Sequence, residues 1–183
     1  MYHHALFPIT YACNLKCSFC AAQSNRDQNV DIPACMEAIR SKKGEVEWVF
    51  ITGGEPFLIQ GLDAVCDELK DLGFKVGVTT NGTFFRPEIS ARVDRIGISL
   101  DGDRAYHDAY RGPGVFDKAV ELFYAIKGKC ETVVMSAAFK ENLDELIRFE
   151  AKVKEMDPDY WQIRQDYNDN SFEIPQKLKE YAV

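Results

Sequence analysis

Cys13, Cys17 and Cys20 stand close together near the start of the chain, with a residue type and spacing suited to metal chemistry. Their pattern, Cys-x-x-x-Cys-x-x-Cys, supplies three thiol groups from eight consecutive residues. Thiolates are soft ligands that suit an iron–sulfur cluster or zinc. A structural zinc ion usually takes four protein ligands, commonly from two cysteine pairs, and the sequence has no second pair. The three cysteines therefore predict a metal site with one position open for a substrate or cofactor.

The other three cysteines, Cys35, Cys66 and Cys130, are isolated, and we interpret them as buried small apolar residues. No apolar run approaches the ~20 residues of a membrane span, and the start of the chain lacks the features of a signal peptide. We therefore expect a cytoplasmic protein with no membrane partner. Reducing conditions there favour metal binding or catalysis by the clustered thiols over a disulfide framework.

Small polar residues and glycines end three of the apolar runs in the sequence. The segments are TGGEP at residues 52–56, TTNG at 79–82 and SLDG at 99–102. In the first, two glycines allow backbone amides to approach a ligand closely because they carry no Cβ atom. The sites of parallel α/β proteins lie at the carboxyl ends of the strands. Together with the cysteine loop, these segments predict one functional site.

Short apolar runs alternate with longer amphipathic runs through most of the 183 residues, which predicts an α/β fold with a parallel sheet. Hydrophobic residues make up 46% of the chain and its net charge is −7, as expected for one globular domain. Near-continuous apolar runs are typical of strands covered by helices. We predict six such strands, at residues 5–11, 47–52, 75–80, 95–100, 132–138 and 160–164.

Apolar residues at helical spacing predict helices between these strands. Four long helices are predicted at residues 32–42, 62–72, 116–127 and 142–156. We also predict a weaker helix at 88–93 and a short terminal helix at 175–181. Crossovers between parallel strands are right-handed almost without exception, so six consecutive βα units curl toward a partial or full barrel. An open doubly wound sheet is the competing arrangement.

The segments CNLKCSFC at residues 13–20 and ITGGEPFL at 51–58, followed by TTNG and SLDG, resemble the motifs of radical S-adenosylmethionine (radical SAM) enzymes. The resemblance extends from the first predicted strand to the helix predicted at 142–156. It implies a (βα)6 partial barrel of the TIM type, with a parallel sheet in a single domain. This core domain would span residues 1–183, with 166–183 as a polar loop and short terminal helix.

The resemblance assigns two cofactors to the loop after the first strand. Cys13, Cys17 and Cys20 would bind three irons of a [4Fe–4S] cluster. The fourth iron would then bind the amino and carboxylate groups of S-adenosylmethionine (SAM). Phe19 would lie against the adenine ring of SAM, although a lone phenylalanine is about as often a core residue.

The resemblance also assigns SAM contacts to the strand ends. Gly53, Gly54 and Glu55 would contact the methionine amino group, which finds carbonyl and carboxylate acceptors there. Glu55 would equally suit the start of a helix, where the helix dipole favours an acid. Asn81 and Ser99 would hydrogen-bond the ribose or carboxylate region of SAM, and each would also suit a turn or a cap.

Three residues beyond the fourth strand have alternative roles. Asp101 would close the fourth-strand loop, or act as a turn residue. Arg111 resembles an arginine that some subgroups direct to the methionine carboxylate, which a guanidinium binds bidentately, and a surface salt bridge is the alternative. We interpret His107 as a loop histidine, with proton transfer near neutral pH as the alternative, and no residue is assigned as catalytic. Alternation along the last two strands predicts three more residues in the barrel interior: Ser136, Gln162 and Arg164.

The resemblance implies reductive cleavage of SAM at the cluster to a 5′-deoxyadenosyl radical, which abstracts hydrogen from substrate. An electron donor such as flavodoxin or ferredoxin would supply the electron. SLDG and the later YHDAYRGPGVF look like the branch of peptide and protein maturases and the molybdenum-cofactor cyclase. A peptide, protein or nucleotide-like substrate is therefore implied. The acidic charge balance argues against nucleic acid as a partner, because phosphate binding needs clustered lysine and arginine.

No cysteine follows Cys130, so we expect this chain to lack the carboxy-terminal auxiliary-cluster domain that such maturases often carry. Two other functions stay open. One is an activase of glycyl-radical enzymes, which is also small and has a single domain. The other is a non-catalytic module that uses the cysteines for zinc or for iron–sulfur electron transfer. This second function leaves the TGGEP segment and the polar strand ends unexplained.

Overall fold

Six parallel strands form one sheet in the computed structural model, which describes residues 4–20, 23–165 and 171–182. The strands lie side by side in chain order. Each observed end falls within one residue of its predicted position, so the six strand predictions are confirmed. The strands are β1 (His4–Thr10), β2 (Trp48–Gly53), β3 (Lys75–Thr80), β4 (Arg95–Ser99), β5 (Glu131–Ala138) and β6 (Tyr160–Gln165).

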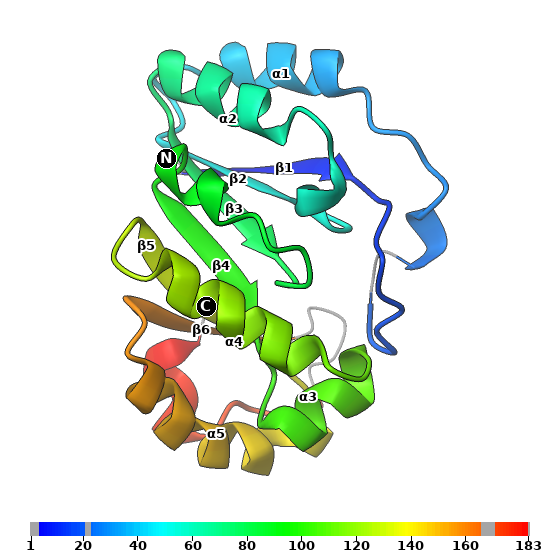
Figure 1. Cartoon of the computed structure of the whole chain (residues 1–183), viewed down its shortest axis with the longest axis vertical. Coiled ribbons are helices and arrows are strands. Elements are labelled where there is room, and N and C mark those ends of the chain that lie inside the picture. Colours follow the sequence, from blue (N-terminus) through cyan, green and yellow to red (C-terminus); the bar gives the residue numbers. More distant parts are fainter. Residues whose placement is uncertain (1–3, 21–22, 166–170, 183) are drawn as a thin grey trace.

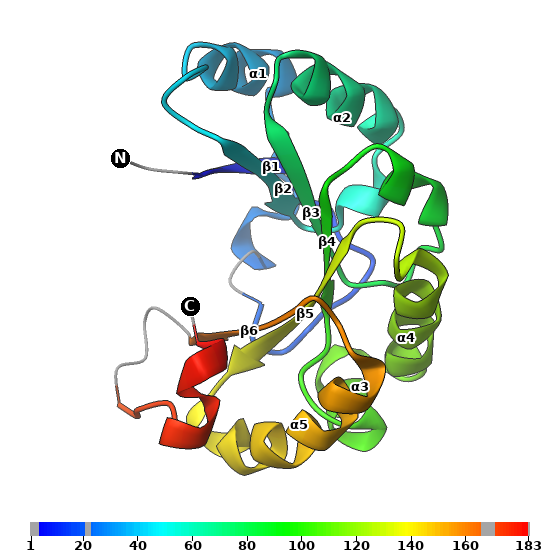
Figure 2. The same ribbon diagram turned by 90° about the vertical axis from the view of Figure 1, so that its left-hand side faces the viewer.

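The sheet is curved, and the α-helices of the described residues pack along its outer, convex face, so the strands form the inner layer (Figure 1, Figure 2). Because β1 and β6 are the two ends of the strand order, the barrel is partial. The predicted (βα)6 partial barrel is therefore confirmed, and the doubly wound arrangement is wrong. The helices are α1 (Ile32–Arg40), α2 (Leu62–Asp71), α3 (Arg104–Arg111), α4 (Val115–Ile126) and α5 (Leu143–Met156).

The hydrophobic core lies between the outer face of the sheet and the helices. Alternate residues of each strand point outward, and Val76 and Val78 of β3 and Ile96 and Ile98 of β4 are at most 1% exposed. Burying a side chain of this size contributes about 1.5–3 kcal/mol, so this layer is the main source of stability. The helix α4 alone buries six residues there: Val115, Phe116, Ala119, Leu122, Phe123 and Ile126.

Helix α3 was not predicted from the sequence. Its sequence, RAYHDAYR, is amphipathic at helical spacing, but it is only eight residues long and polar on average, so it contains no apolar run. Signals at its two ends were available, because Asp103 accepts a hydrogen bond from the Tyr106 amide at 3.0 Å and Gly112 follows the last turn. The interpretation of His107 as a loop histidine is therefore wrong, because the residue lies in α3 and is fully buried.

Short 3-10 helices complete the chain. The weak helix expected at 88–93 is the 3-10 helix η3, and the expected terminal helix is η5. Of the polar loop expected between β6 and the terminal helix, residues 166–170 lie outside the described residues. The 3-10 helices are η1 (Gln23–Asn25), η2 (Pro56–Leu58), η3 (Pro87–Ala91), η4 (Lys140–Asn142) and η5 (Gln176–Tyr181).

The inner face of the sheet is open near the amino ends of the strands. Leu6 of β1 is 59% exposed and Tyr160 of β6 is 47% exposed. Between them, the rings of Trp48 and Phe50 stack at a centroid distance of 5.3 Å. The Arg95 guanidinium lies 4.6 Å from the ring centroids of both Trp48 and Tyr160. These contacts cover part of the inner face, but no second layer of helices from the described residues packs on it (Figure 2).

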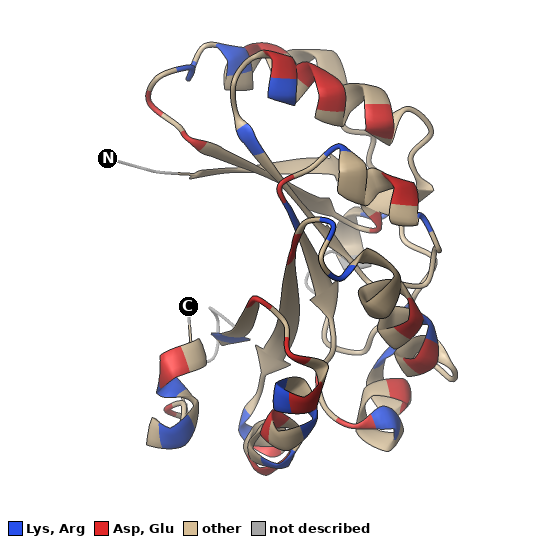
Figure 3. Ribbon diagram, turned by 60° about the vertical axis from the view of Figure 1, so that its left-hand side comes forward, with Lys and Arg blue, Asp and Glu red and all other residues tan. Residues whose placement is uncertain are grey.

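Charged residues lie mainly on the outer helices and at the strand ends. Figure 3 shows lysine and arginine interspersed with aspartate and glutamate along these helices. The ion pairs include Arg40 with Glu68, 2.6 Å apart, and Lys70 with Asp94, also 2.6 Å apart. Within the described ranges, no helix has the length and apolar character needed to cross a membrane.

The 3-10 helix η5 packs against α5 through a nearly buried carboxylate. Glu150 of α5 accepts from Lys177 Nζ at 2.7 Å, from Lys154 Nζ at 2.8 Å and from the Tyr181 hydroxyl at 3.3 Å. The two lysines lower the pKa of Glu150 to about 2. This carboxylate therefore contributes stability above its ordinary pKa of 4.5, which is lost as the pH falls through about 2.

We predict that Glu150→Gln lowers the free energy of unfolding at pH 7 by about 1 kcal/mol, because charge-assisted hydrogen bonds become neutral ones. Urea unfolding measures this change, and proteolysis within η5 should become faster. Glu155→Gln is the matched control, because Glu155 lies in the same helix but pairs with Lys152 at an exposed position. Equal losses in the two variants would contradict the prediction.

Candidate active site

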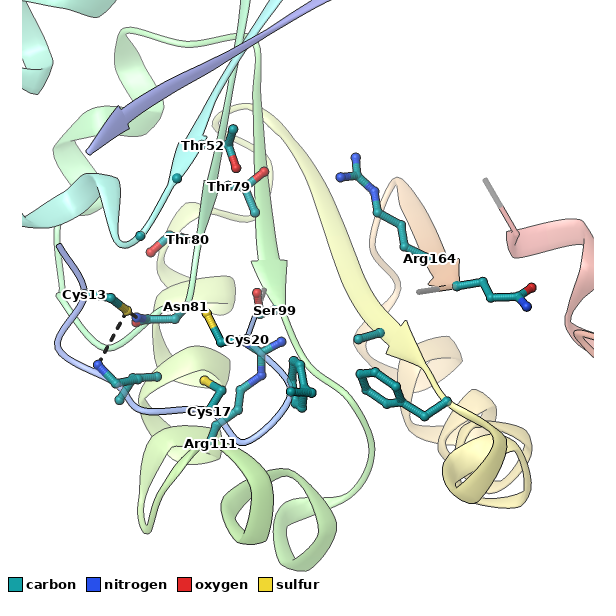
Figure 4. A pocket seen from close by; sticks show the side chains of 17 residues that line it. Cys13, Cys17, Cys20, Thr52, Thr79, Thr80, Asn81, Ser99, Arg111 and Arg164 are labelled. Atoms are coloured by element: carbon teal, nitrogen blue, oxygen red, sulfur yellow. Dashed lines mark hydrogen bonds between the residues drawn. The ribbon is translucent and has the colours of Figure 1, made fainter. Parts of the chain in front are cut away.

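A cavity of about 420 Å³ lies at the carboxyl ends of the strands, where the sequence predicts a site. Figure 4 shows the three cysteines, Asn81 and Arg111 toward one end of the hollow and Arg164 across it. Nine of the eleven predicted cofactor and metal residues line the cavity: Cys13, Cys17, Phe19, Cys20, Gly53, Gly54, Asn81, Ser99 and Arg111. The other two, Glu55 and Asp101, are fully buried behind its wall.

Glu55 connects the turn after β2 to the end of β3 through its buried carboxylate. Its Oε1 accepts from the Phe57 amide at 2.9 Å and from the Thr80 hydroxyl at 2.7 Å. Its Oε2 accepts from the Asn81 amide at 2.7 Å. Burial raises the pKa of Glu55, and these donors oppose that effect. Glu55 therefore positions Asn81 from behind the cavity, and its predicted contact with the methionine amino group stays a prediction.

Asp101 and Arg111 form a buried ion pair at the cavity wall. Arg111 Nε lies 2.5 Å from Asp101 Oδ2, and Arg111 Nη2 lies 3.2 Å from Oδ1. Oδ1 also accepts from the Ala137 amide at 2.9 Å, so this carboxylate connects the ends of β4 and β5 with α3. The Asp101 side chain is 1% exposed and that of Arg111 is 11% exposed. The pair fixes the direction of the guanidinium and is not the surface salt bridge considered as an alternative.

His107 packs behind Asp101. Its Nδ1 accepts from the Asp101 backbone amide at 3.2 Å, and its ring meets that of Phe116 edge-on at a centroid distance of 5.9 Å. Its Nε2 has no hydrogen-bond partner among the described residues. Burial lowers the pKa of His107 to about 4. The ring is therefore neutral at pH 7, which keeps Nδ1 available as an acceptor.

The two glycines after β2 allow the cysteine loop to pack on the turn. A Cβ atom on Gly53 would lie 2.0 Å from the Thr10 carbonyl oxygen, and one on Gly54 would lie 2.1 Å from the Ala12 carbonyl oxygen. The same carbonyls accept hydrogen bonds, Thr10 from the Gly54 amide at 2.6 Å and Ala12 from the Glu55 amide at 2.9 Å. Because Gly53 and Gly54 carry no side chain, there is room for the backbone of residues 10–12 as well as for the cavity.

Asn81 connects the turn after β3 to the cysteine loop. Its Nδ2 donates to Asn14 Oδ1 at 3.1 Å and lies 3.8 Å from Cys13 Sγ. Its Oδ1 accepts from the Thr83 amide at 2.9 Å. Asn81 is therefore both a turn residue and part of the cavity wall, where Ser99 of β4 lies as well.

Phe19 is fixed by three neighbours. Its ring centroid lies 4.8 Å from that of Phe139 and 6.5 Å from that of Tyr110, with both pairs tilted. The Arg111 guanidinium lies 5.2 Å from the Phe19 centroid, in cation–π contact. Phe19 is half-buried and lines the cavity, so it is not the core residue considered as an alternative.

Of the three strand residues predicted in the barrel interior, Arg164 is confirmed and the other two do not line the cavity. Arg164 pairs in register with Ala137, which also lines the cavity. Ser136 points to the opposite face, where Trp161 Nε1 donates to its hydroxyl at 2.9 Å. Gln162 lies on the face of Arg164, two residues nearer the amino end of β6, so it does not reach the cavity.

Seven lining residues were not singled out as site residues from the sequence. Thr52, Thr79 and Thr80 stand within the TGGEP and TTNG segments, so the polar strand ends carried a signal for them. Leu15 stands within the CNLKCSFC segment but has no polar group to single it out. Three residues carried no signal because they belong to no motif: Ala137, Phe139 and Gln165.

Among the described residues that line the cavity, the thiols are the only acid groups. These residues include three cysteines but no carboxylate and no imidazole. Burial raises the pKa of the Cys17 thiol, and the positive charge of Arg111 opposes this effect. The interpretation of the remaining cysteines as buried is confirmed for Cys66, whereas Cys35 and Cys130 are half-buried.

A family model described as the radical SAM superfamily matches residues 7–153. The chain belongs to this superfamily. The match runs from β1 into α5 and includes the cysteine loop and the three polar strand ends. Radical SAM enzymes use a [4Fe–4S] cluster together with SAM, as the sequence resemblance implies.

Three known proteins align with most of this chain. The mycofactocin maturase MftC of Mycolicibacterium smegmatis is 30% identical over 154 residues, which are 78% of this chain and 39% of MftC. An AdoMet-dependent heme synthase of Methanosarcina barkeri is 28% identical over 164 residues, which are 81% of this chain and 46% of the synthase. SuiB of Streptococcus suis, bound to precursor peptide SuiA, has a TM-score of 0.79 and 21% identity, covering 99% of this chain and 45% of SuiB. The chain therefore spans less than half the length of each.

The ligand set of the cavity fits the radical SAM cofactors. In a [4Fe–4S] cluster each cysteine thiolate binds a different iron, so three cysteines leave one iron without a protein ligand. The described part of the lining offers no carboxylate or imidazole for that iron. In the part of the chain that the structure describes, no three Cys, His, Asp or Glu side chains converge to hold a single metal ion. A cluster does not require that convergence, because its thiolates bind separate irons.

Gly54→Ala should destabilise the radical SAM fold by about 3 kcal/mol, because the new methyl group overlaps the Ala12 carbonyl and forces the cysteine loop off the turn. Urea unfolding measures the loss, and alkylation of Cys13 should become faster. Gly44→Ala is the control, since its Cβ would meet nothing within 4 Å and only its φ of +89° adds strain, about 1–2 kcal/mol. Unchanged alkylation in Gly54→Ala would contradict this role for the turn.

The buried His107 should make stability fall on mild acidification. Its pKa drops from 6.5 to about 4 on folding, so below pH 6.5 the unfolded chain binds a proton that the folded chain does not. The wild type should lose about 2 kcal/mol more than His107→Gln between pH 7 and pH 5 in urea unfolding. Glutamine can still accept from the Asp101 amide but does not titrate. Parallel losses in the two proteins would contradict the prediction.

Proposed function

We propose that this chain is the catalytic core of a radical SAM enzyme whose Cys13, Cys17 and Cys20 bind the [4Fe–4S] cluster. The observation that supports this proposal most directly is the lining of the 420 Å³ cavity, where the described residues supply three thiols but no carboxylate or imidazole. When bound, the cluster and SAM would supply a one-electron cleavage that yields a hydrogen-abstracting 5′-deoxyadenosyl radical. The protein itself binds these groups and excludes competing reactions.

We propose further that Arg111 binds the carboxylate of SAM. Asp101 engages Nε and Nη2 of this arginine, which leaves its other N–H groups for a ligand in the cavity. A guanidinium whose direction is fixed before binding loses less entropy when it meets a carboxylate. Asn81, Ser99 and Phe19 also line the cavity and complete the proposed SAM contacts. Glu55 and Asp101 act as positioning residues in this proposal.

A peptide or protein is the substrate that we propose. Supporting this choice, the chain is 30% identical to a maturase, and its fold matches SuiB, which was solved with a precursor peptide. Beyond the proposed SAM contacts, the cavity has a side formed by Ala137, Phe139, Arg164 and Gln165, where a substrate residue would lie. A flavodoxin or ferredoxin would donate the electron, and the cytoplasm is the proposed location.

Anaerobic reconstitution with iron and sulfide tests the proposed function. The wild-type chain should bind about four irons and four sulfides and form 5′-deoxyadenosine from SAM when a strong reductant is added. Cys17→Ala should lose both properties. Cys35→Ala is the matched control and should keep both, because Cys35 lies in α1 outside the cavity.

Two results would contradict the proposal. Stoichiometric zinc without SAM cleavage would indicate the non-catalytic module. A Cys17→Ala variant that keeps its cluster and activity would disprove the ligand assignment. Formation of a glycyl radical on a large partner protein would instead identify the activase and remove the peptide substrate.

A further inference from the structure

A second, smaller cavity of about 190 Å³ adjoins the candidate active site. We call it the aromatic side cavity, and the proposed function does not use it. Phe19 and Phe139 line both cavities, so their rings form the wall between them. The residues that line the aromatic side cavity are Ser18, Phe19, Tyr106, Tyr110, Phe139 and Glu141.

Aromatic rings from three separate elements form most of this cavity. Tyr106 and Tyr110, on successive turns of α3, stack at a centroid distance of 4.6 Å. Tyr110 then contacts Phe19 of the cysteine loop at 6.5 Å, and Phe19 contacts Phe139, after β5, at 4.8 Å. The four rings therefore form one continuous wall. Aromatic faces carry negative charge density, so such a wall attracts cations.

Glu141 gives the aromatic side cavity its charge. It is the single charged residue in the lining, it is exposed, and no ion pair or hydrogen bond engages its carboxylate in the part of the chain that the structure describes. Arg111 lies near Phe19 but already pairs with Asp101, and it does not line this cavity. An unpaired carboxylate beside aromatic faces favours a cationic ligand over a neutral or anionic one.

The volume limits what this ligand is. Sites for drug-sized molecules usually measure about 300–1,000 Å³, so about 190 Å³ suits one side chain better than a nucleoside. An aliphatic stem packs well on aromatic rings, and an ammonium or guanidinium head at its end reaches a carboxylate. Lysine and arginine side chains have both parts.

We propose that the aromatic side cavity binds a lysine or arginine side chain of the substrate peptide. This inference rests on the proposed function, because it takes the substrate to be a peptide. A substrate residue bound there would place its sequence neighbours across the Phe19 and Phe139 wall, in the cavity of the three cysteines. The side cavity would thus select the position in the peptide that reacts.

Binding of small probes to the cluster-loaded chain tests this site without requiring turnover. The probes are Nα-acetyl-lysine methylamide and Nα-acetyl-norleucine methylamide, which differ by the ammonium group, and saturation-transfer NMR measures their dissociation constants. We expect the lysine probe to bind at least about five-fold more tightly in the wild type. Glu141→Gln should abolish this preference, and Glu141→Asp should keep part of it.

Matched variants separate the cavity from general charge effects. Asp144→Asn removes another exposed acid, from the start of α5 and outside the cavity, and should keep the preference. Tyr106→Leu removes a ring and should weaken binding of the lysine probe, whereas Tyr106→Phe keeps the ring and should not. Equal binding of the two probes, or a preference that survives in Glu141→Gln, would overturn the proposal. A loss in Asp144→Asn as large as that in Glu141→Gln would also overturn it.

The proposed function fails separately from this inference. Glu141 lies outside the cavity that we assign to the cofactors, so Glu141→Gln should form 5′-deoxyadenosine from SAM at the wild-type rate when no peptide is present. If neither the wild type nor Glu141→Gln forms 5′-deoxyadenosine, the proposed function is wrong whatever the probes show. If both form it but the lysine preference is absent, only the side-cavity proposal is wrong.

Discussion

Buried carboxylates determine the arrangement of the strand ends, because an open barrel has no inner core to do so. The outer face of the sheet packs on helices, but no second layer of described residues covers the inner face. Glu55 and Asp101 lie at the carboxyl ends of the strands with no exposed surface. Taking a carboxylate out of water costs several kcal/mol unless donors satisfy it, so each of these groups fixes the groups that donate to it.

The partners of the two carboxylates explain why separate loops form one cavity. Glu55 accepts from η2, from Thr80 and from Asn81, so β2 and β3 end in a fixed relation to each other. Asp101 accepts from the Arg111 side chain and from the Ala137 amide, so α3 and the end of β5 also lie in a fixed relation to each other. The residues that orient the wall are thus distinct from those that line it. A site built in this way exists before any ligand binds, which lowers the entropy cost of binding.

The sequence was sufficient for the strands and for the site residues as a group, and the reason is physical. Each strand buries one face on helices and therefore shows an apolar run, and parallel strands bring their carboxyl ends to one edge. Helix α3 was beyond this reasoning because most of its surface is polar. The motif also could not show that Glu55 is fully buried and engaged by three donors, because a motif gives the position of a carboxylate and not the donors around it.

The prediction for β5 and β6 shows the same limit at the level of one strand. Ser136 and Arg164 were predicted to share the interior, but the register places Ala137, not Ser136, beside Arg164. Side chains alternate along a strand, so an error of one residue in register moves a side chain to the other face. The register depends on pairing between strands far apart in the sequence, and the run of apolar residues in β5 does not encode it.

Two arginines that line the cavity differ in burial and in pairing. Arg111 is nearly buried and paired with Asp101, so its charge is largely balanced before a ligand arrives. Arg164 is exposed, and no partner engages it among the described residues. A balanced, oriented cation suits a ligand whose pose is always the same, as a cofactor's is, whereas an unpaired one is free to adapt to different partners. This difference supports the proposal that the cofactors bind on the side of the cysteine loop and the substrate on the β6 side.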